Sequence, residues 1–267
     1  MNALFNFFKL VQNENMKIYR RPRTYVMLGI LLALIAAISI IGYFVDHNHN
    51  TSAWSMIMTE VMISYTLITV FTIIIASSGV ADEFTSGTIK LLLIRPWTRS
   101  KILLSKYIAV LLYALGMVVV MLLFTVVLNI ILFDASDNAA ADIVSPLVSG
   151  SIAAYLIKYA LLKYVSLIVT TTLAFMLATV SRSGALAIGL SLFLILGVNS
   201  FTPLLAALKY KWADYILFIH LDLTQYLNDT PLRDGSTMGF SIAVLAIYYA
   251  IFVALAWYVF KKRDVAA

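Results

Sequence analysis

Six long apolar blocks occupy nearly the whole of this 267-residue chain. A helix needs about 20 residues to cross the roughly 30 Å hydrocarbon core of a bilayer, so six such blocks leave no room for a soluble catalytic domain. Hydrophobic residues make up 62% of the sequence and charged residues only 12%, an apolar excess that ordinary soluble domains lack. The pattern predicts an all-α integral membrane protein with six transmembrane helices in a single membrane domain, residues 1–267. The expected spans cover about residues 24–45, 54–81, 102–133, 164–180, 185–200 and 239–260.

Residues 1–23 precede the first span and are predicted to form an N-terminal amphipathic interfacial helix. Apolar side chains such as Phe7 and Phe8 alternate there with lysines and asparagines at helical spacing. A helix of this length with phenylalanines opposite lysines is expected to lie in the membrane interface, although an ordinary solvated tail is the alternative. Pro22, among three arginines, favours a sharp change of direction between this helix and the first span.

The basic residues are unevenly distributed between the two sides of this topology. Of the 19 Lys and Arg residues, 14 fall in segments 1–23, 82–106, 182 and 261–263. The positive-inside rule then predicts a multi-pass membrane protein with both termini in the cytoplasm, and we expect the membrane to be a bacterial cell membrane. Anionic lipid headgroups explain this basic excess better than nucleic acid does, so the bilayer is an expected partner and nucleic acid is not.

The chain carries few motifs of catalytic or metal chemistry. It contains no cysteine, no phosphate-binding GxxxxGKS/T loop, no HExxH and no GxSxG, so we expect no enzyme, no cofactor and no metal bound by this chain. His47 and His49 share a short loop, where solvated side chains are a better interpretation than a metal site, since no third ligand is near.

The loop after the third span contains only acidic charges. Asp134, Asp137 and Asp142 have a composition that could attract a cation, but they lack the spacing of a calcium loop and are interpreted as marking the external side.

Three ionisable residues form a possible transport pathway. Glu60 lies a turn or two inside the second span, and it is either an intramembrane proton or cation relay or, as we favour, a residue at the interface. Lys158 and Lys163 interrupt the run from residue 152 to 180. We expect an interfacial helix up to about Lys163, with the lysines reaching the headgroups, and a lysine pair facing an anionic substrate is the alternative.

The polar stretch from Asp82 to Lys106 lies between the second and third spans and has an ordered pattern of its own. Apolar residues recur at helical spacing, and Pro96 is expected to end this short helix because proline lacks the amide hydrogen. Thr98 or Ser100 is placed to cap the next span. The residues alone predict a cytoplasmic ledge with one apolar face, which is either a docking surface or an ordered loop.

The letters EFTSGTIKLL from position 83 and RPWTRSK from position 95 closely resemble the segment between the second and third spans of type-2 ABC transporter permeases. The resemblance implies a membrane-spanning permease subunit of an ABC exporter, moving a drug, an antimicrobial peptide or a lipid-like substrate. It also implies a second permease copy, forming a homodimer, and two copies of a separate ABC ATPase subunit that binds the ATP and Mg. The ledge would be the coupling helix that contacts the ATPase. The residues that match the motif are Glu83, Gly87, Thr88, Pro96 and Arg99, while Trp97 departs from it.

Two other classes compete with this prediction. A stand-alone ion-coupled membrane transporter would use Glu60, Lys158 and Lys163 as its pathway. An intramembrane enzyme is disfavoured, because no pairing of nucleophile and base is visible in the spans.

Overall fold

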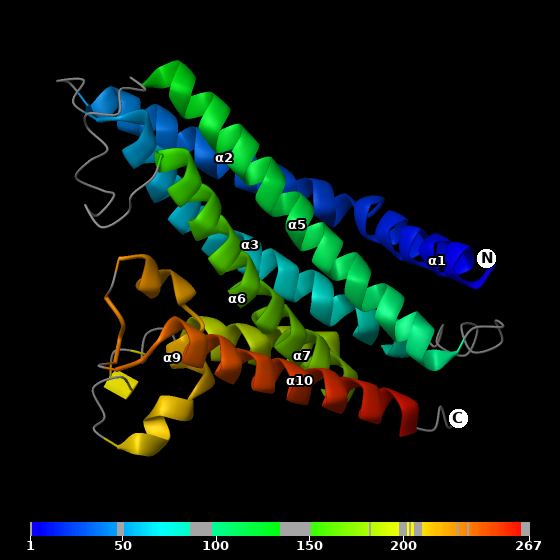
Figure 1. Ribbon diagram of the computed structural model, residues 1–267. Coiled ribbons are helices and arrows are strands. Elements are labelled where there is room, and N and C mark those ends of the chain that lie inside the picture. Colours follow the sequence, from blue (N-terminus) through cyan, green and yellow to red (C-terminus); the bar gives the residue numbers. More distant parts are fainter. Residues whose placement is uncertain are drawn as a thin grey trace.

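The computed structural model describes residues 2–46, 51–85, 98–133, 151–181, 183–197, 202, 204–205, 210–228, 230–233 and 235–262. Every element in these ranges is helical (Figure 1). The long helices are α1 (Asn2–Tyr19), α2 (Pro22–Val45), α3 (Ala53–Thr85), α5 (Arg99–Leu132), α6 (Ile152–Ser181) and α10 (Met238–Lys262). The short elements are α7 (Gly184–Leu192), the π-turn η2 (Phe193–Gly197), the 3₁₀ turns η3 (Lys211–Tyr215) and η4 (Leu223–Leu227), and α9 (Leu217–His220).

Five helices of the described chain, rather than the six predicted, are long and apolar enough to cross a membrane. They are α2, α3 as far as Asp82, α5, α6 and α10. The fifth predicted span, residues 185–200, is not confirmed by the residues that the structure describes. The 9 residues of α7 and the 5 of η2 together rise about 20 Å at roughly 1.5 Å per residue, too little for the hydrocarbon core.

The fourth predicted span, about residues 164–180, and the interfacial helix predicted before it belong to one continuous 30-residue helix, α6, from Ile152 to Ser181. No proline or glycine interrupts this sequence, and lysines are good helix formers. A break does occur at Pro22, where α1 ends at Tyr19 and α2 begins with the proline in its first turn. Thr98 is the N-cap of α5, but its side chain makes no capping hydrogen bond.

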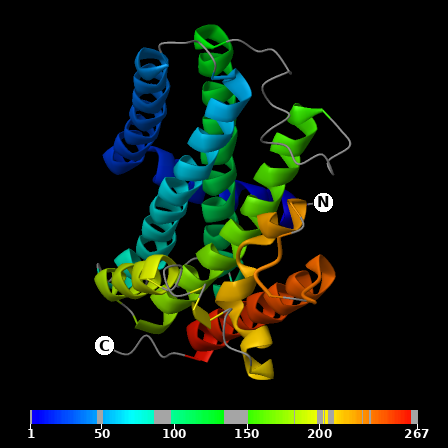
Figure 2. The same cartoon turned by 90° about the vertical axis from the view of Figure 1, so that its left-hand side faces the viewer.

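Helices α3 and α6 form the centre of the bundle. In Figure 2 they lie between α2 and α5 above and α7 and α10 below, and α3 packs against α2, α5, α6 and α7. In the most apolar 18-residue stretch of each long helix, the share of buried residues is 61% in α3 and 61% in α6. It is only 17% in α2 and 22% in α10. The outer helices therefore turn most of their apolar side chains to the surroundings, as a bilayer solvent permits.

Both termini lie at the same end of the bundle, on the right in Figure 1, and η3, α9 and η4 lie at the opposite end. Helix α6 brings the chain to the end with the termini, and α10 brings it there again. The segment between them must therefore return the chain to the other end, and α7 and η2, packed against α6 and α3, begin this return.

Candidate functional site

Two polar clusters lie on opposite faces of the central helix α3. An α-helix turns by about 100° per residue, so Tyr65, Thr66 and Thr69 are rotated by about 140–240° around the α3 axis relative to Glu60. These three residues line a pocket on the other face of α3. The first cluster is fully enclosed by α2, α3 and α5. The second is an open pocket between α3, α6 and the short elements that follow η2.

The enclosed cluster is centred on the Glu60 carboxyl group, which has no solvent exposure. Ser39 of α2 donates its hydroxyl to Glu60 Oε1 at 2.5 Å, and Asn129 Nδ2 of α5 donates to Oε2 at 2.7 Å. The same Nδ2 donates to the Thr125 carbonyl at 2.9 Å, while Asn129 Oδ1 accepts no hydrogen bond. No Lys, Arg or His in the described chain forms an ion pair with Glu60. A buried carboxyl group without a cation is costly inside a membrane, and groups of this kind are candidates for ion relays.

Helical spacing explains how the sequence assembles this cluster. On α2, Leu31, Ile35 and Ser39 follow one another at intervals of four and are all fully buried, so the hydroxyl occupies the position of a core residue. Thr125 and Asn129 are likewise four apart on α5, which aligns both on one face. The helices α2, α3 and α5 therefore bring Ser39, Glu60 and Asn129 together at the same level of the bundle.

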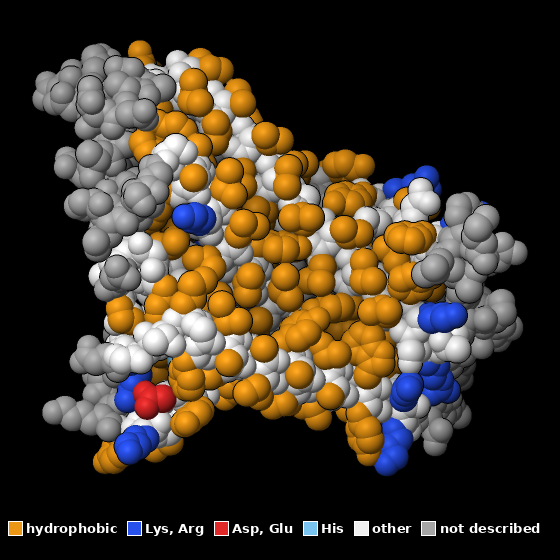
Figure 3. Space-filling model, in the orientation of Figure 1, with side chains coloured by type: hydrophobic (Ala, Val, Ile, Leu, Met, Phe, Trp, Pro, Cys, Tyr) orange, Lys and Arg blue, Asp and Glu red, His pale blue; other side chains and the backbone are white. Residues whose placement is uncertain are grey.

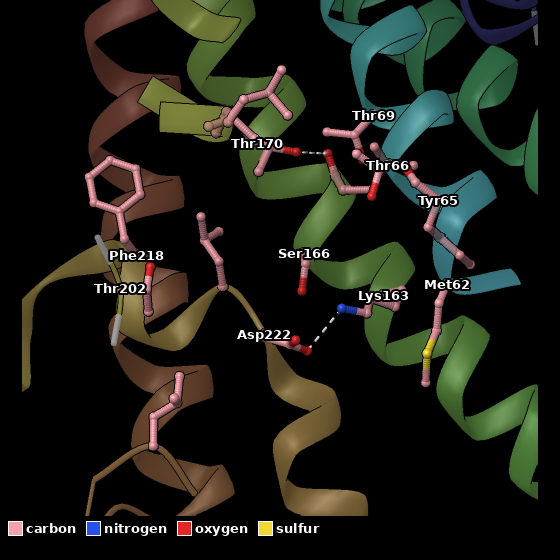
Figure 4. Close-up of a pocket in the computed structure, with 15 residues that line it drawn as sticks. Met62, Tyr65, Thr66, Thr69, Lys163, Ser166, Thr170, Thr202, Phe218 and Asp222 are labelled. Carbon is pink, nitrogen blue, oxygen red and sulfur yellow. Dashed lines mark hydrogen bonds and ion pairs between the residues drawn. The ribbon is translucent and has the colours of Figure 1, made fainter. Parts of the chain in front are cut away.

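The second cluster is a pocket of about 380 Å³. Its walls carry the hydroxyl groups of Thr66 and Thr69 from α3 and of Ser166 and Thr170 from α6 (Figure 4). Thr69, Ser166 and Thr170 each donate to a backbone carbonyl of their own helix, at 2.8, 3.2 and 3.0 Å. Their oxygen lone pairs consequently remain able to accept hydrogen bonds from a guest molecule. Tyr65 and Thr202 also line the pocket, and its apolar walls are formed by Met62, Leu167, Ile195, Leu196, Phe218, Leu221 and Leu232.

An ion pair lies at one side of this pocket, where Lys163 Nζ of α6 is 3.0 Å from Asp222 Oδ1 (Figure 4). Asp222 precedes η4, and its side chain also accepts from the Thr224 backbone N–H at 3.1 Å. Burial by itself would raise the pKa of Asp222, but the Lys163 ammonium and the Thr224 hydrogen bonds outweigh it and hold that pKa below its ordinary value. The pocket thus presents one cation and one anion beside hydroxyl oxygens and apolar walls.

The structure does not bring the three predicted pathway residues together. Glu60 is buried within the bundle, where Ser39 and Asn129 satisfy its oxygens, and its interfacial depth in the membrane stays a prediction. Lys163 lines the pocket and pairs with Asp222. Lys158 is exposed and lines neither cluster.

The predicted ledge lies largely outside the described residues. Helix α3 continues to Thr85, and nothing further is described for Glu83, Gly87, Thr88 or Pro96. Arg99 is the first residue of α5, and its guanidinium donates to the Lys261 carbonyl at 3.4 Å. The loop residues considered as metal ligands, namely His47, His49, Asp134, Asp137 and Asp142, also lie outside the described ranges.

The sequence alone did not point to Asp222, Ser39 or Asn129. Asn129 gave a usable signal, since an amide within a strongly apolar span usually needs a partner. Asp222 gave none, because it is one of several acidic residues in the predicted external segments and nothing local distinguishes it from the others.

An all-helical multi-pass membrane protein is the class that this fold defines. The family model described as "Protein of unknown function (DUF2705)" matches residues 24–266, and the chain belongs to this family. Two Bacillus subtilis (strain 168) proteins are similar along their whole lengths. "Uncharacterized protein YhcI" is 36% identical over 312 residues, covering 96% of this chain and 99% of its own. "Uncharacterized membrane protein YdbK" is 27% identical over 262 residues, covering 94% of this chain and 99% of its own.

These matches correct the resemblance to the type-2 ABC permeases. The family that spans residues 24–266 is DUF2705, so the short motif around residues 83–101 was too weak to assign the family. An ATPase partner, a coupling helix and a homodimer were implied by that resemblance alone, and they lose their support with it.

Proposed function

We propose that this protein is a membrane carrier for a small amphipathic solute, which it binds in the pocket between α3 and α6. The observation that supports the proposal is the pocket itself: about 380 Å³, with hydroxyl oxygens and the Lys163–Asp222 pair on otherwise apolar walls. This volume lies within the usual range of small-molecule sites, about 300–1,000 Å³.

The distribution of groups in the pocket favours a solute that carries both charges. An anionic group of the solute would pair with Lys163, and a cationic group with Asp222, so that neither protein charge loses a partner when the existing pair opens. The apolar part of the solute would contact side chains such as Leu167 and Phe218. A zwitterionic amphiphile has this combination of groups.

Ion coupling is the second part of the proposal. Glu60 lies on the opposite face of the same helix, and its hydrogen-bonding partner Ser39 can serve a carboxylate or a carboxylic acid, since a hydroxyl both donates and accepts. Asn129 Nδ2 donates to the other oxygen in either state. Both protonation states of Glu60 are thus satisfied inside the bundle, so the carboxyl group is suited to take up and release a proton, and in this proposal a proton gradient drives the carrier.

The matched lysines of α6 provide the test of the solute site. Lyso-phosphatidylethanolamine, a zwitterionic amphiphile, is titrated against the purified protein in detergent. Lys163→Gln should weaken binding about tenfold, which corresponds to the loss of roughly 1.4 kcal/mol. Lys158→Gln, five residues earlier on the same helix and exposed, should bind as the wild type does. Equal binding by wild type and Lys163→Gln would overturn the assignment of the pocket.

A flux assay tests the coupling. In proteoliposomes, an imposed proton gradient should accelerate uptake of the same lysolipid by the wild type. Glu60→Gln keeps an oxygen for Asn129 and an N–H for Ser39, so it should fold and bind normally yet lose the response to the gradient. A response that survives in Glu60→Gln would eliminate Glu60 as the coupling group.

A further inference from the structure

A basic pocket lies at the end of the bundle that carries the termini, away from the proposed solute site. It is a small cavity of about 50 Å³ between α1, α2, α3 and α5. Four cationic side chains line it, compared with two carboxylates, and the rest of its wall is mostly apolar. The cationic residues are Lys17, Arg21, Arg23 and Lys106, and the carboxylates are Glu14 and Asp82.

The two carboxylates are already paired. Glu14 accepts from Lys17 at 2.5 Å and from Lys106 at 2.8 Å, and Asp82 accepts from Arg21 at 2.8 Å. These contacts leave the pocket with two more positive than negative side chains. Arg23 has a buried Nε that donates no hydrogen bond in the described chain, and the charge attracting its guanidinium is that of Asp82, which already pairs with Arg21.

The start of α2 adds a second feature that favours an anion. Arg21 is its N-cap and makes no side-chain capping hydrogen bond, and the first turn contains no acidic residue. Pro22 has no N–H, and the Thr24 N–H bonds to the Arg21 carbonyl at 3.0 Å. The positive end of the helix dipole thus lies beside Arg23 with no acidic residue in its own first turn, and helix N-termini attract phosphate groups.

The surroundings distinguish a lipid phosphate from a dissolved one. Helix α1 exposes Phe8 and buries Leu10 and Val11, the pattern of a helix lying in the membrane interface. The apolar wall of the pocket, with Ile18, Ile75 and Val110, suits the glycerol backbone beneath a headgroup. We propose that this pocket binds the phosphate of an anionic phospholipid, with Arg23 as the main contact. The proposal is independent of the transport function.

Two neighbouring arginines allow a matched test. The purified protein is incorporated into nanodiscs that contain phosphatidylglycerol or only phosphatidylcholine, and the lipids retained after transfer to detergent are counted by native mass spectrometry. The wild type should retain phosphatidylglycerol. Arg23→Gln should weaken retention about fivefold or more. Arg20→Gln removes an exposed charge three residues away that does not line the pocket, and it should leave retention unchanged.

A second variant and a competitor separate lipid binding from misfolding and from the binding of a soluble anion. Arg23→Lys keeps the charge without the guanidinium and should retain an intermediate amount of lipid, so that misfolding of Arg23→Gln cannot imitate the result. Inorganic phosphate in millimolar excess should not displace the lipid. Displacement by inorganic phosphate would show a site for a soluble anion, and equal loss in Arg20→Gln would show only general surface attraction; either result overturns the proposal.

Discussion

At the scale of single residues, Asn129 has the most demanding position in the membrane part. Its Nδ2 satisfies both the Glu60 carboxyl group and the Thr125 carbonyl. Asn129→Leu would leave Glu60 with the Ser39 hydroxyl as its remaining donor within the described chain, in a site without solvent exposure. A buried polar group that loses a partner costs about 1–3 kcal/mol, and we expect a destabilisation in the lower half of that range because membrane hydrogen bonds are modest. Unfolding by denaturing detergent in bicelles measures it.

Two further variants show whether this cost is due to the hydrogen bond. Adding Glu60→Leu to Asn129→Leu removes the orphaned carboxyl and should recover much of the lost stability, because replacing both partners by apolar groups is nearly neutral. Val127→Leu, on the exposed face of α5, should have no effect. If the double variant is less stable than Asn129→Leu, the carboxyl is not the source of the destabilisation.

At the scale of elements, an ion pair joins α1 to α5. Glu14 and Lys106 are both nearly fully buried and lie 2.8 Å apart, whereas Lys17 is more exposed. Lys106→Met should therefore loosen α1 at neutral pH, with a cost of roughly 1–3 kcal/mol from the under-satisfied carboxylate. Spin labels at Gln12→Cys and Leu104→Cys, two exposed positions, should report a broader distance distribution. Arg20→Met serves as the charge control. An unchanged spin-label distance distribution in Lys106→Met would show that the ion pair does not hold α1 against α5.

The same contact predicts a dependence on pH. Burial alone would raise the pKa of Glu14, but the Lys106 charge and the hydrogen bonds from Lys106 and Lys17 lower it below the ordinary value of 4.5. A lowered pKa in the folded state means that the stabilisation is complete above 4.5 and is lost as the pH falls through the folded value. The spin-label distribution should thus stay narrow from neutral pH to about 4.5 and broaden below it. Glu14→Gln should remove this acid transition, and a transition that persists in that variant would assign it to another group.

Two elements show what the sequence could and could not predict. The first span was predictable from its apolar run, which ends near Val45 as expected. Helix α6 was predictable only in part, since Lys158 and Lys163 indicated an interfacial helix before a shorter span. The helix is continuous, Lys158 is exposed, and Lys163 pairs with Asp222, about 60 residues later in the chain. For α7, composition predicted a span, but apolar character does not determine where a helix passes into a π-turn.

At the scale of the whole molecule, the membrane class followed from composition, while the polar clusters depended on how helices rotate about their axes. Figure 3 shows an apolar band across the bundle, with Lys and Arg side chains toward both ends and more of them at the right-hand end. Such a band was predictable from the apolar blocks alone. The contacts of Glu60 with Ser39 and Asn129 were not, because they require three helices to turn these polar residues toward the same point.

The orientation of the bundle can be tested directly. We propose that the end with the termini faces the cytoplasm, because most basic residues lie in segments at that end. The natural sequence has no cysteine, so single thiols give no background. In intact cells, a membrane-impermeant maleimide should label Thr230→Cys, an exposed position near η4. It should label Gln12→Cys in α1 and Lys262→Cys in α10 only after permeabilisation.

Labelling of Gln12→Cys and Lys262→Cys in intact cells, with Thr230→Cys protected, would reverse the orientation. Labelling of Gln12→Cys and Lys262→Cys on opposite sides would contradict the fold itself, since both termini lie at one end of the bundle.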